Sequence, residues 1–165
     1  MPLSANADRI VDQTDRRILA LVQRDAKLPQ AEVAKRVGLS TAAVNERLKK
    51  LERAQVIRGY VARVDARAVG APITAFVEVF VEHPRYEAAF LERLMGLDEV
   101  QECHHITGEF SLLLKVRVRD IDALQHLLLE QLGTTEGVRQ TKTVMVLSTV
   151  KEESFVPTGA GREPA

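Results

Sequence analysis

The chain has 165 residues and no formal net charge, since 23 Lys and Arg balance 23 Asp and Glu, and 45% of its residues are hydrophobic. This length suits one or two small domains with buried cores. One Cys excludes a disulfide-stabilised secreted scaffold, and no apolar run reaches the ~18–20 residues of a membrane span, so we expect a cytoplasmic protein with no signal peptide and no membrane partner.

The charge is divided unevenly between the two parts of the chain. Residues 1–60 carry 12 Lys and Arg against 7 Asp and Glu, a net charge of +5, whereas residues 61–165 carry 11 against 16, a net charge of −5. Such asymmetry is typical of a polyanion-binding part joined to a part with another task. Ordinary surface variation explains the charge alone equally well, so the residue pattern has to decide between the two.

The N-terminal part has the apolar spacing of three helices. The first is expected at about residues 14–24, the second begins at Pro29 and stops at Gly38, and the third has Ser40 as its N-cap. Residues 57–64 are expected to form a short extended hairpin or connecting strand.

The apolar period changes from helical to alternating after Gly70 and Pro72. The predicted order is β-α-β-β-α-β, the split βαβ or ferredoxin-like plan. The expected strands cover residues 74–81, 100–106, 110–118 and 138–147, and the expected helices cover 84–95 and 120–132.

The sequence therefore predicts an α+β protein in which a three-helix domain precedes a ferredoxin-like βαββαβ domain. The expected segments are a disordered tail over 1–11, a three-helix domain over 12–60, a connecting strand or linker over 61–72, an αβ domain over 73–156, and a flexible tail over 157–165.

Two helices cover only one face of a four-stranded sheet. The other face is expected to expose Leu113, Met145 and Leu147, with Phe76 or Val79 beside them. An apolar patch of this size is rarely left in water. We therefore expect a homodimer that forms through the C-terminal sheet.

Four residues have the spacing of a helix-turn-helix. Ala34 lies where two helices cross closely, Gly38 is at the turn, Ser40 caps the next helix, and Val44 anchors that helix in the core. A plain three-helix bundle is the alternative. The basic and amide side chains along the third helix favour DNA binding.

The N-terminal residues of a recognition helix usually face the base edges. The expected base-reading residues are Thr41, Ala42, Asn45, Glu46 and Lys49. The expected phosphate-binding residues are Lys27, Arg47, Lys50, Arg53 and Arg58. A two-fold dimer implies a pseudo-palindromic DNA site.

The C-terminal domain offers no convergent acid, base or nucleophile set, so we do not expect an enzyme. Cys103, His104 and His105 are clustered, but adjacent strand residues point to opposite faces, so no metal site and no cofactor are expected. Gly108 is the one glycine well placed for a ligand, in a turn whose backbone N–H groups can receive an anion. A plain hairpin turn is the alternative there.

These residues together resemble the leucine-responsive/asparagine-responsive (Lrp/AsnC) regulators, over about residues 12–157. The resemblance rests on Thr14-Asp15-Arg16-Arg17-Ile18-Leu19, Val37-Gly38-Leu39-Ser40, Val44, Arg47, Leu51-Glu52, Val56-Ile57-x-Gly59-Tyr60, Ala75-Phe76-Val77, Val100, Cys103, Thr107-Gly108, Leu114-Lys115-Val116 and Thr141-x-Thr143.

The resemblance implies a DNA-binding transcriptional regulator with a winged helix-turn-helix domain over 12–60 and an effector-binding and oligomerisation domain over 73–156. It also implies dimers that assemble further, often into octamers, and bind an amino acid where dimers meet. The implied effector segment is Ile106, Thr107, Gly108, Glu109, Phe110 and Ser111. Two positions depart from the family pattern, because Ser111 replaces a frequent Asp and Gln55 replaces a usual Gly. A ligand-independent DNA-architectural protein of the same fold is the alternative function.

Overall fold

The computed structural model describes residues 11–160 and divides into two compact units. One unit comprises residues up to Ala62 together with those from Glu152 onward, and the other comprises Arg63–Lys151. The C-terminal end thus belongs to the same unit as the N-terminal helices. None of the helices in the described range combines the length and apolarity needed to cross a membrane.

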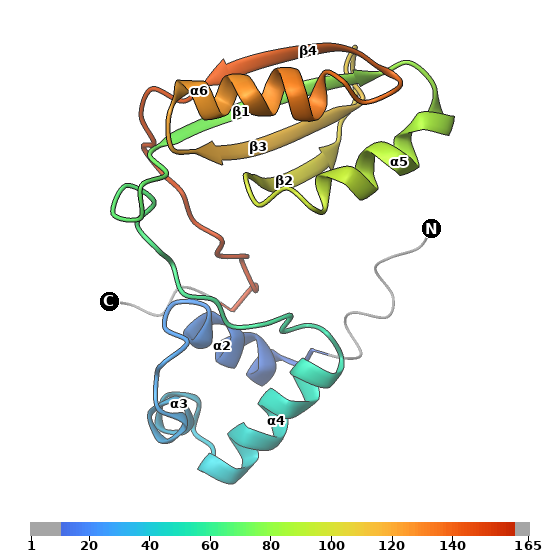
Figure 1. Ribbon diagram of the computed structural model, residues 1–165. Helices are drawn as coiled ribbons and strands as arrows, with labels where there is room; N and C mark the ends of the chain where they lie inside the picture. The colour runs from blue at the N-terminus through green and yellow to red at the C-terminus, as the bar shows by residue number, and fades with distance from the viewer. Residues whose placement is uncertain (1–10, 161–165) are drawn as a thin grey trace. The chain divides into compact units, whose positions relative to one another are not determined.

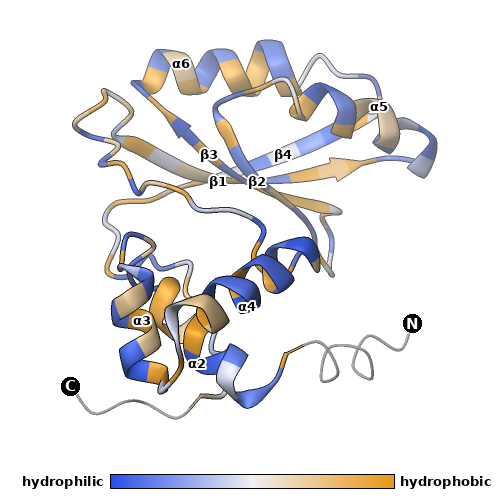
Figure 2. Cartoon of the chain, turned by 90° about the horizontal axis from the view of Figure 1, so that it is seen from below, coloured by the Kyte–Doolittle hydropathy of each residue, from blue (hydrophilic) through white to orange (hydrophobic). Residues whose placement is uncertain are grey.

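The described residues of the N-terminal unit form three helices, α2 (Gln13–Val22), α3 (Gln30–Val37) and α4 (Thr41–Arg53) (Figure 1). Their apolar residues meet in one core, in which Ile18, Val33, Val44 and Leu51 are fully or almost fully buried. Figure 2 shows hydrophilic residues along much of α4, while orange apolar residues of α2 and α3 gather between the helices. Each helix is therefore amphipathic and is stabilised by its neighbours.

The segment after α4 does not form the expected hairpin, and residues 54–72 contain no strand. A strand needs a hydrogen-bonded neighbour, and this segment is held by side chains instead. Ile57 is buried in the helical core, and the Tyr60 hydroxyl donates a hydrogen bond to Glu52 Oε1 at 2.9 Å. Burial and this carboxylate raise the pKa of Tyr60 to about 12.

The second unit contains β1 (Ile73–Val81), α5 (Pro84–Leu94), β2 (Val100–His105), β3 (Leu112–Val118), α6 (Ile121–His126), the π-helix η1 (Leu127–Leu132) and β4 (Val138–Met145). The strands form one antiparallel sheet in the order β2-β3-β1-β4. Figure 1 shows α5, α6 and η1 over one face of this sheet. The predicted β-α-β-β-α-β order is confirmed.

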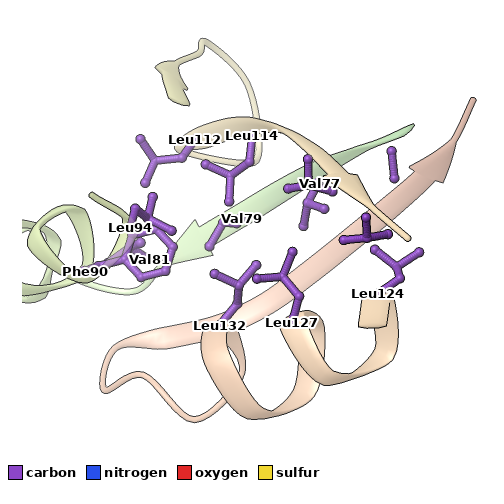
Figure 3. Close-up of a cluster of buried hydrophobic side chains, with 13 residues drawn as sticks. Val77, Val79, Val81, Phe90, Leu94, Leu112, Leu114, Leu124, Leu127 and Leu132 are labelled. Atoms are coloured by element: carbon purple, nitrogen blue, oxygen red, sulfur yellow. The ribbon is translucent and has the colours of Figure 1, made fainter. Parts of the chain in front are cut away.

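The core of the second unit lies between this sheet and these helices (Figure 3). Alternation along β1 and β3 puts every second residue inward, such as Val77 and Leu114, which are fully buried. Phe90 of α5 and Leu127 and Leu132 of the second helical segment fill the space beneath them. Burial of such apolar side chains is the main stabilising contribution of the unit.

The last helical segment is not a uniform α-helix. Its final turns widen into η1, where the Gly133 N–H donates to Leu128 O, five residues earlier, at 2.9 Å. The regular apolar spacing of the sequence predicted a single α-helix here. Leu127 and Leu132 are five residues apart, and the wider turn lets both lie in the core.

The strand register corrects two residues of the uncovered sheet face. Val79 is fully buried on the helix-covered face, and Met145 pairs with Ala75, which faces the same way. The register therefore selects Phe76 over Val79 for the uncovered face, and it moves Met145 to the covered face, since a one-residue offset reverses every side chain. Residues that alternate with the inward set lie on the uncovered face: Phe76, Glu78, Phe80, Leu113, Lys115, Lys142 and Val144.

The turn after α4 has a strained backbone at Gln55, where the family pattern usually has Gly. Gln55 has φ of +55°, and it is the only non-glycine residue within 11–160 that has a positive φ. Its N–H donates to Glu52 O and the Val56 N–H donates to Leu51 O, both at 2.9 Å, which is the Schellman helix ending. Glycine adopts this conformation without a Cβ clash.

Replacing Gln55 by Gly is expected to raise the free energy of unfolding of the N-terminal unit by about 1 kcal/mol, because the left-handed backbone is costly for a side chain. Urea denaturation followed by circular dichroism measures this. Gln55→Ala is the control, because it also loses the Gln55 side chain but keeps a Cβ. A gain in both variants, or in neither, would contradict the backbone explanation.

Candidate DNA-binding and effector-binding surfaces

Helices α3 and α4 are joined by a tight turn of the helix-turn-helix kind. Gly38 has φ of +75° and ends α3, and its N–H and that of Leu39 both point to Ala34 O. Ser40 Oγ accepts a hydrogen bond from the Ala43 N–H at 3.2 Å and so caps α4. Ala34 and Val44 are buried between the helices. The four residues chosen for their spacing therefore lie at one corner of the structure.

The five expected base-reading residues lie along the first half of α4. Thr41, Ala42, Glu46 and Lys49 are exposed, and Asn45 is half-buried. Lys49 Nζ lies 3.4 Å from Glu46 Oε1, an exposed contact that contributes little to stability. This part of α4 thus presents amide, hydroxyl, methyl and charged groups in a row toward solvent.

The basic residues expected to bind phosphates divide into two groups. Lys27, Arg53 and Arg58 are exposed. Arg47 and Lys50 instead contact carboxylates of the first helix: Arg47 Nη1 lies 2.7 Å from Asp15 Oδ1, and Lys50 Nζ lies 2.6 Å from Asp15 Oδ2. The structure therefore gives Arg47 and Lys50 an intramolecular role that the sequence did not suggest.

Among the described residues of this unit, Asp15 is the only charged residue that is fully buried. The N–H of Asp12 donates to the Asp15 carboxylate and the N–H of Asp15 donates to Asp12 Oδ1, which together form a capping box at the start of α2. Arg47 also reaches Asp12 Oδ2 at 2.6 Å. Two acids of α2 and two bases of α4 thus form one network.

The network shifts the pKa of each carboxyl that it contains. Burial on its own raises the pKa of Asp15, but hydrogen bonds from Lys50, Arg47 and the Asp12 N–H outweigh burial and lower it below its ordinary value. The hydrogen bond from Arg47 is the main cause that lowers the pKa of Asp12. The spacing Asp12-x-x-Asp15 before an apolar stripe is the sequence signal that could have revealed the capping box.

The expected effector segment connects β2 to β3 as a six-residue turn, longer than the three-residue turn that the sequence predicted. The Ile106 N–H donates to Ser111 O at 3.0 Å, and the Ser111 N–H donates to Val79 O at 3.1 Å, which fixes both ends of the turn to the sheet. At its tip Gly108 has φ of +125°, and no atom lies within 4 Å of the position of a Cβ there.

The side chains of this turn have different environments. Thr107 and Glu109 are exposed, Ser111 is half-buried and Phe110 is buried. The Phe110 ring centroid is 6.0 Å from Lys142 Nζ. The turn is therefore anchored at both ends by backbone hydrogen bonds, and its one buried side chain, Phe110, lies near a basic residue of β4.

His104 and His105 lie on opposite faces of β2. His104 Nε2 is 3.2 Å from Glu102 Oε2, whereas His105 Nε2 is 2.8 Å from Glu87 Oε1 of α5. Burial is the main cause that raises the pKa of the neighbouring Cys103 thiol. Within residues 11–160 no three His, Cys, Asp or Glu side chains are grouped to hold a metal ion.

Two family models match the chain, and together they cover both units. A winged helix-turn-helix DNA-binding model matches residues 11–58, and the Lrp/AsnC ligand binding domain matches residues 74–156. The chain belongs to the Lrp/AsnC family. The resemblance seen in the sequence, and the fold class predicted from it, are both confirmed.

Relatives of this Lrp/AsnC chain match it over nearly its whole length. The leucine-responsive regulatory proteins of Escherichia coli K12 and Klebsiella pneumoniae are 38% identical over 146 residues, which is 87% of this chain and 89% of theirs. The family consists of DNA-binding transcription regulators rather than enzymes. The present protein is therefore a transcription regulator with a helix-turn-helix domain and a ligand-binding domain.

Solved structures of the family have the same fold. A transcriptional regulator of Neisseria meningitidis in complex with L-methionine has a TM-score of 0.85 and 30% identity, covering 89% of this chain and 96% of its own. Escherichia coli AsnC has a TM-score of 0.81 and 31% identity, covering 88% and 97%. The Mycobacterium tuberculosis feast or famine regulatory protein, complexed with L-methionine, has a TM-score of 0.81 and 34% identity, covering 88% and 97%.

Replacing Asp15 by Asn is expected to destabilise the N-terminal unit by about 2 kcal/mol at pH 7, because Arg47 and Lys50 lose their buried partner. The pKa of Asp15 is depressed in the folded state, so its contribution is complete above the ordinary Asp value of 3.8 and is lost as the pH falls below it. Urea denaturation of both proteins between pH 7 and pH 3 measures the difference.

The difference between wild type and Asp15→Asn should therefore shrink toward pH 3. Asp12→Asn is the matched control: Asp12 is exposed and Asn caps helices as well as Asp does, so a smaller loss is expected. A difference that stays constant over this pH range would show that the Asp15 charge contributes nothing.

Proposed function

We propose that this regulator reads pseudo-palindromic duplex DNA with the first half of α4 and that an amino acid bound at the 106–111 turn modulates it. The exposed row of polar side chains on α4, directly after the tight turn at Gly38, carries the first part of the proposal. The described chain presents this row on a rigid helix, and rigid presentation is what base reading requires.

The chemistry of the row fits base edges. An Asn amide such as Asn45 can pair with adenine through two hydrogen bonds, a Lys ammonium such as Lys49 can reach guanine, and the Ala42 methyl can contact the methyl group of thymine. Thr41 and Glu46 complete the set by donating or accepting hydrogen bonds. We propose these roles for the side chains that α4 exposes or half-exposes.

The basic residues around this row would bind phosphates. Arg53, Arg58 and Lys27 are exposed and suited to phosphate contacts. Arg47 and Lys50 contribute less to DNA binding in this proposal, because the carboxylates of Asp12 and Asp15 already neutralise them. Their main task is to hold α4 against α2.

Replacing Asn45 by Ala should relax the sequence preference at one base pair by roughly tenfold, because the paired amide contact is lost. Replacing Arg53 by Ala should weaken binding to all sequences alike and reduce the slope of log affinity against log salt by about one phosphate. Selection from random duplexes, followed by competition binding at several salt concentrations, measures both effects.

Arg139→Ala is the control for this experiment, because it removes an exposed Arg with the same charge from the other unit, where it pairs with Glu82. Binding by the Arg139 variant should equal wild type. A uniform loss of affinity in Asn45→Ala, with the selected sequence unchanged, would contradict base reading by Asn45.

The second part of the proposal is an amino-acid effector. Its support is the anchored turn with the exposed backbone at Gly108, and the fact that two regulators of similar fold were crystallised with L-methionine. We assign the binding surface to Ile106, Thr107, Gly108, Glu109, Phe110 and Ser111. Ser111 lacks a carboxylate for the ligand ammonium, so Glu109 supplies it in this proposal.

The uncovered sheet face supports a homodimer. Phe76, Phe80, Leu113 and Val144 place apolar groups there, and Val144 is half exposed. The charged side chains between them are paired, as in Lys142 Nζ to Glu78 Oε2 at 2.9 Å. Apolar groups with internally neutralised charges suit a buried interface between two copies. Such dimers would assemble further, into an octamer, with the effector bound where they meet.

A thermal-shift screen of the twenty amino acids, beginning with L-methionine, tests the effector. A ligand at a hundred times its Kd stabilises the folded state by about 2.7 kcal/mol, which raises the Tm by several degrees. Gly108→Leu should abolish that shift, because a side chain would cover the turn and strain its backbone. Gly70→Leu is the matched control, since Gly70 also has positive φ and open space around it.

A shift that Gly70→Leu keeps and Gly108→Leu loses assigns the site to the turn. A shift that both variants keep would overturn the site but not the effector. No shift with any amino acid, together with unchanged DNA binding, would favour a ligand-independent architectural protein of the same fold.

A further inference from the structure

The C-terminal segment contacts the DNA-binding unit of its own chain. Residues 152–160, here called the clasp, contain no helix or strand but lie beside α2 (Figure 1). Gln23, at the end of α2, forms two hydrogen bonds with one residue of the clasp. Its Nε2 donates to Val156 O at 3.1 Å, and the Val156 N–H donates to its Oε1 at 2.9 Å.

Two further contacts fix the clasp on either side of this pair. The Arg24 guanidinium lies 5.5 Å from the Phe155 ring centroid, a cation–π distance, and Arg16 Nη1 donates to Thr158 O at 2.9 Å. Arg16 lies in the first half of α2, Gln23 is its C-cap and Arg24 follows in the next turn, so the three contacts are spread over the length of the helix. The clasp therefore follows α2 instead of touching it at one point.

The contact between Gln23 and the clasp depends on the backbone of the clasp. The side chain of Val156 remains 66% exposed, whereas its N–H and C=O are both paired with the Gln23 amide. Such a pairing needs an extended backbone held at a fixed distance, and ordering the segment costs conformational entropy that several contacts must offset. Phe155 and Thr158, both half-buried, supply the flanking contacts.

The clasp changes how the two units are connected. The chain passes from the DNA-binding unit to the ligand-binding unit between Ala62 and Arg63, and it returns between Lys151 and Glu152. The first connection follows α4, and the second leads from β4 to α2. Two connections, rather than one, therefore join the sheet to the helix-turn-helix.

We propose that the clasp couples the two units: when it is closed on α2 it holds the helices in the arrangement that binds DNA, and when it opens DNA affinity falls. The regulatory part rests on the proposed DNA binding, whereas the closure itself does not. Coupling of this kind is reciprocal, so DNA that favours the closed clasp must also reduce its opening.

Hydrogen exchange of the Val156 amide in the full chain measures the closure directly. In wild type this amide should exchange at least tenfold more slowly than an unprotected amide, and it should lose this protection in Gln23→Ala. Gln13→Ala, at the exposed start of the same helix, is the matched control and should leave the Val156 amide protected. Adding duplex DNA should slow its exchange in wild type further.

DNA affinity measures the coupling. Gln23→Ala and Phe155→Ala should each bind the selected duplex about fivefold more weakly than wild type, at the low end of typical coupling between sites, and Gln13→Ala should not. Circular dichroism shows whether each variant keeps its helices, so that misfolding is distinguished from opening of the clasp.

If the Val156 amide of wild type exchanges at the unprotected rate, the proposal that the clasp closes on α2 is wrong. Protection that Gln23→Ala removes without any change in DNA affinity overturns the coupling but not the contact. A wild type that binds no duplex DNA overturns the proposed function and the coupling with it, while the Val156 exchange of the free protein still judges the contact.

Discussion

The buried carboxylate of Asp15 is the interaction on which the DNA-binding unit depends. A charge with no solvent exposure is tolerated only where hydrogen bonds and opposite charges surround it. Asp15 receives the Asp12 N–H, Arg47 and Lys50, so burying it forces α4 to keep its basic edge against the start of α2. The orientation of the recognition helix is thus set by electrostatics as well as by apolar packing, which is less directional.

The same interaction changes how the charge of this unit is interpreted. The excess of basic residues in the first sixty positions suggested a polyanion-binding part, but two of these residues, Arg47 and Lys50, form ion pairs with acids of the same chain. Arg53, Arg58 and Lys27 remain exposed and keep their charge toward solvent. The net charge therefore indicated the class of partner. The ion pairs show which basic side chains hold α4 against α2 and which face solvent.

Most of the fold could be predicted because local patterns determine it. Alternation in β1 and β3, and the spacing of Gly38, Ser40 and Val44, follow from helix and strand geometry alone. The errors arose where a partner distant in the sequence decides. The face of Met145 depends on its register with β1, and the segment after α4 has no strand neighbour among the described residues of this chain.

In the candidate sites, too, local patterns could be predicted and contacts with distant residues could not. Exposure along α4 follows from its helical period, so the base-reading row could be placed from the sequence. The carboxylates that pair with Arg47 and Lys50 lie more than thirty residues earlier, and no local pattern connects them. The C-terminal residues are still more distant from their contacts: Val156 meets Gln23 across 133 positions. A Gly- and Pro-rich composition predicted only a tail there, because composition reports the absence of a core and not the presence of a backbone partner.

Helix α2 is consequently fixed at both ends by different chemistry. Its start is held to α4 by Asp12 and Asp15, and its end is held to the clasp by Gln23 and Arg24. The ion pairs of Asp15 are partly buried and charge-assisted, whereas the two hydrogen bonds of Gln23 are exposed and neutral, so the contact at Gln23 is the weaker of the two. Local opening starts where buried contacts are fewest. An input from the sheet would therefore release the end of α2 before it disturbs the network that orients α4, and the recognition helix would lose support gradually while the domain stays folded.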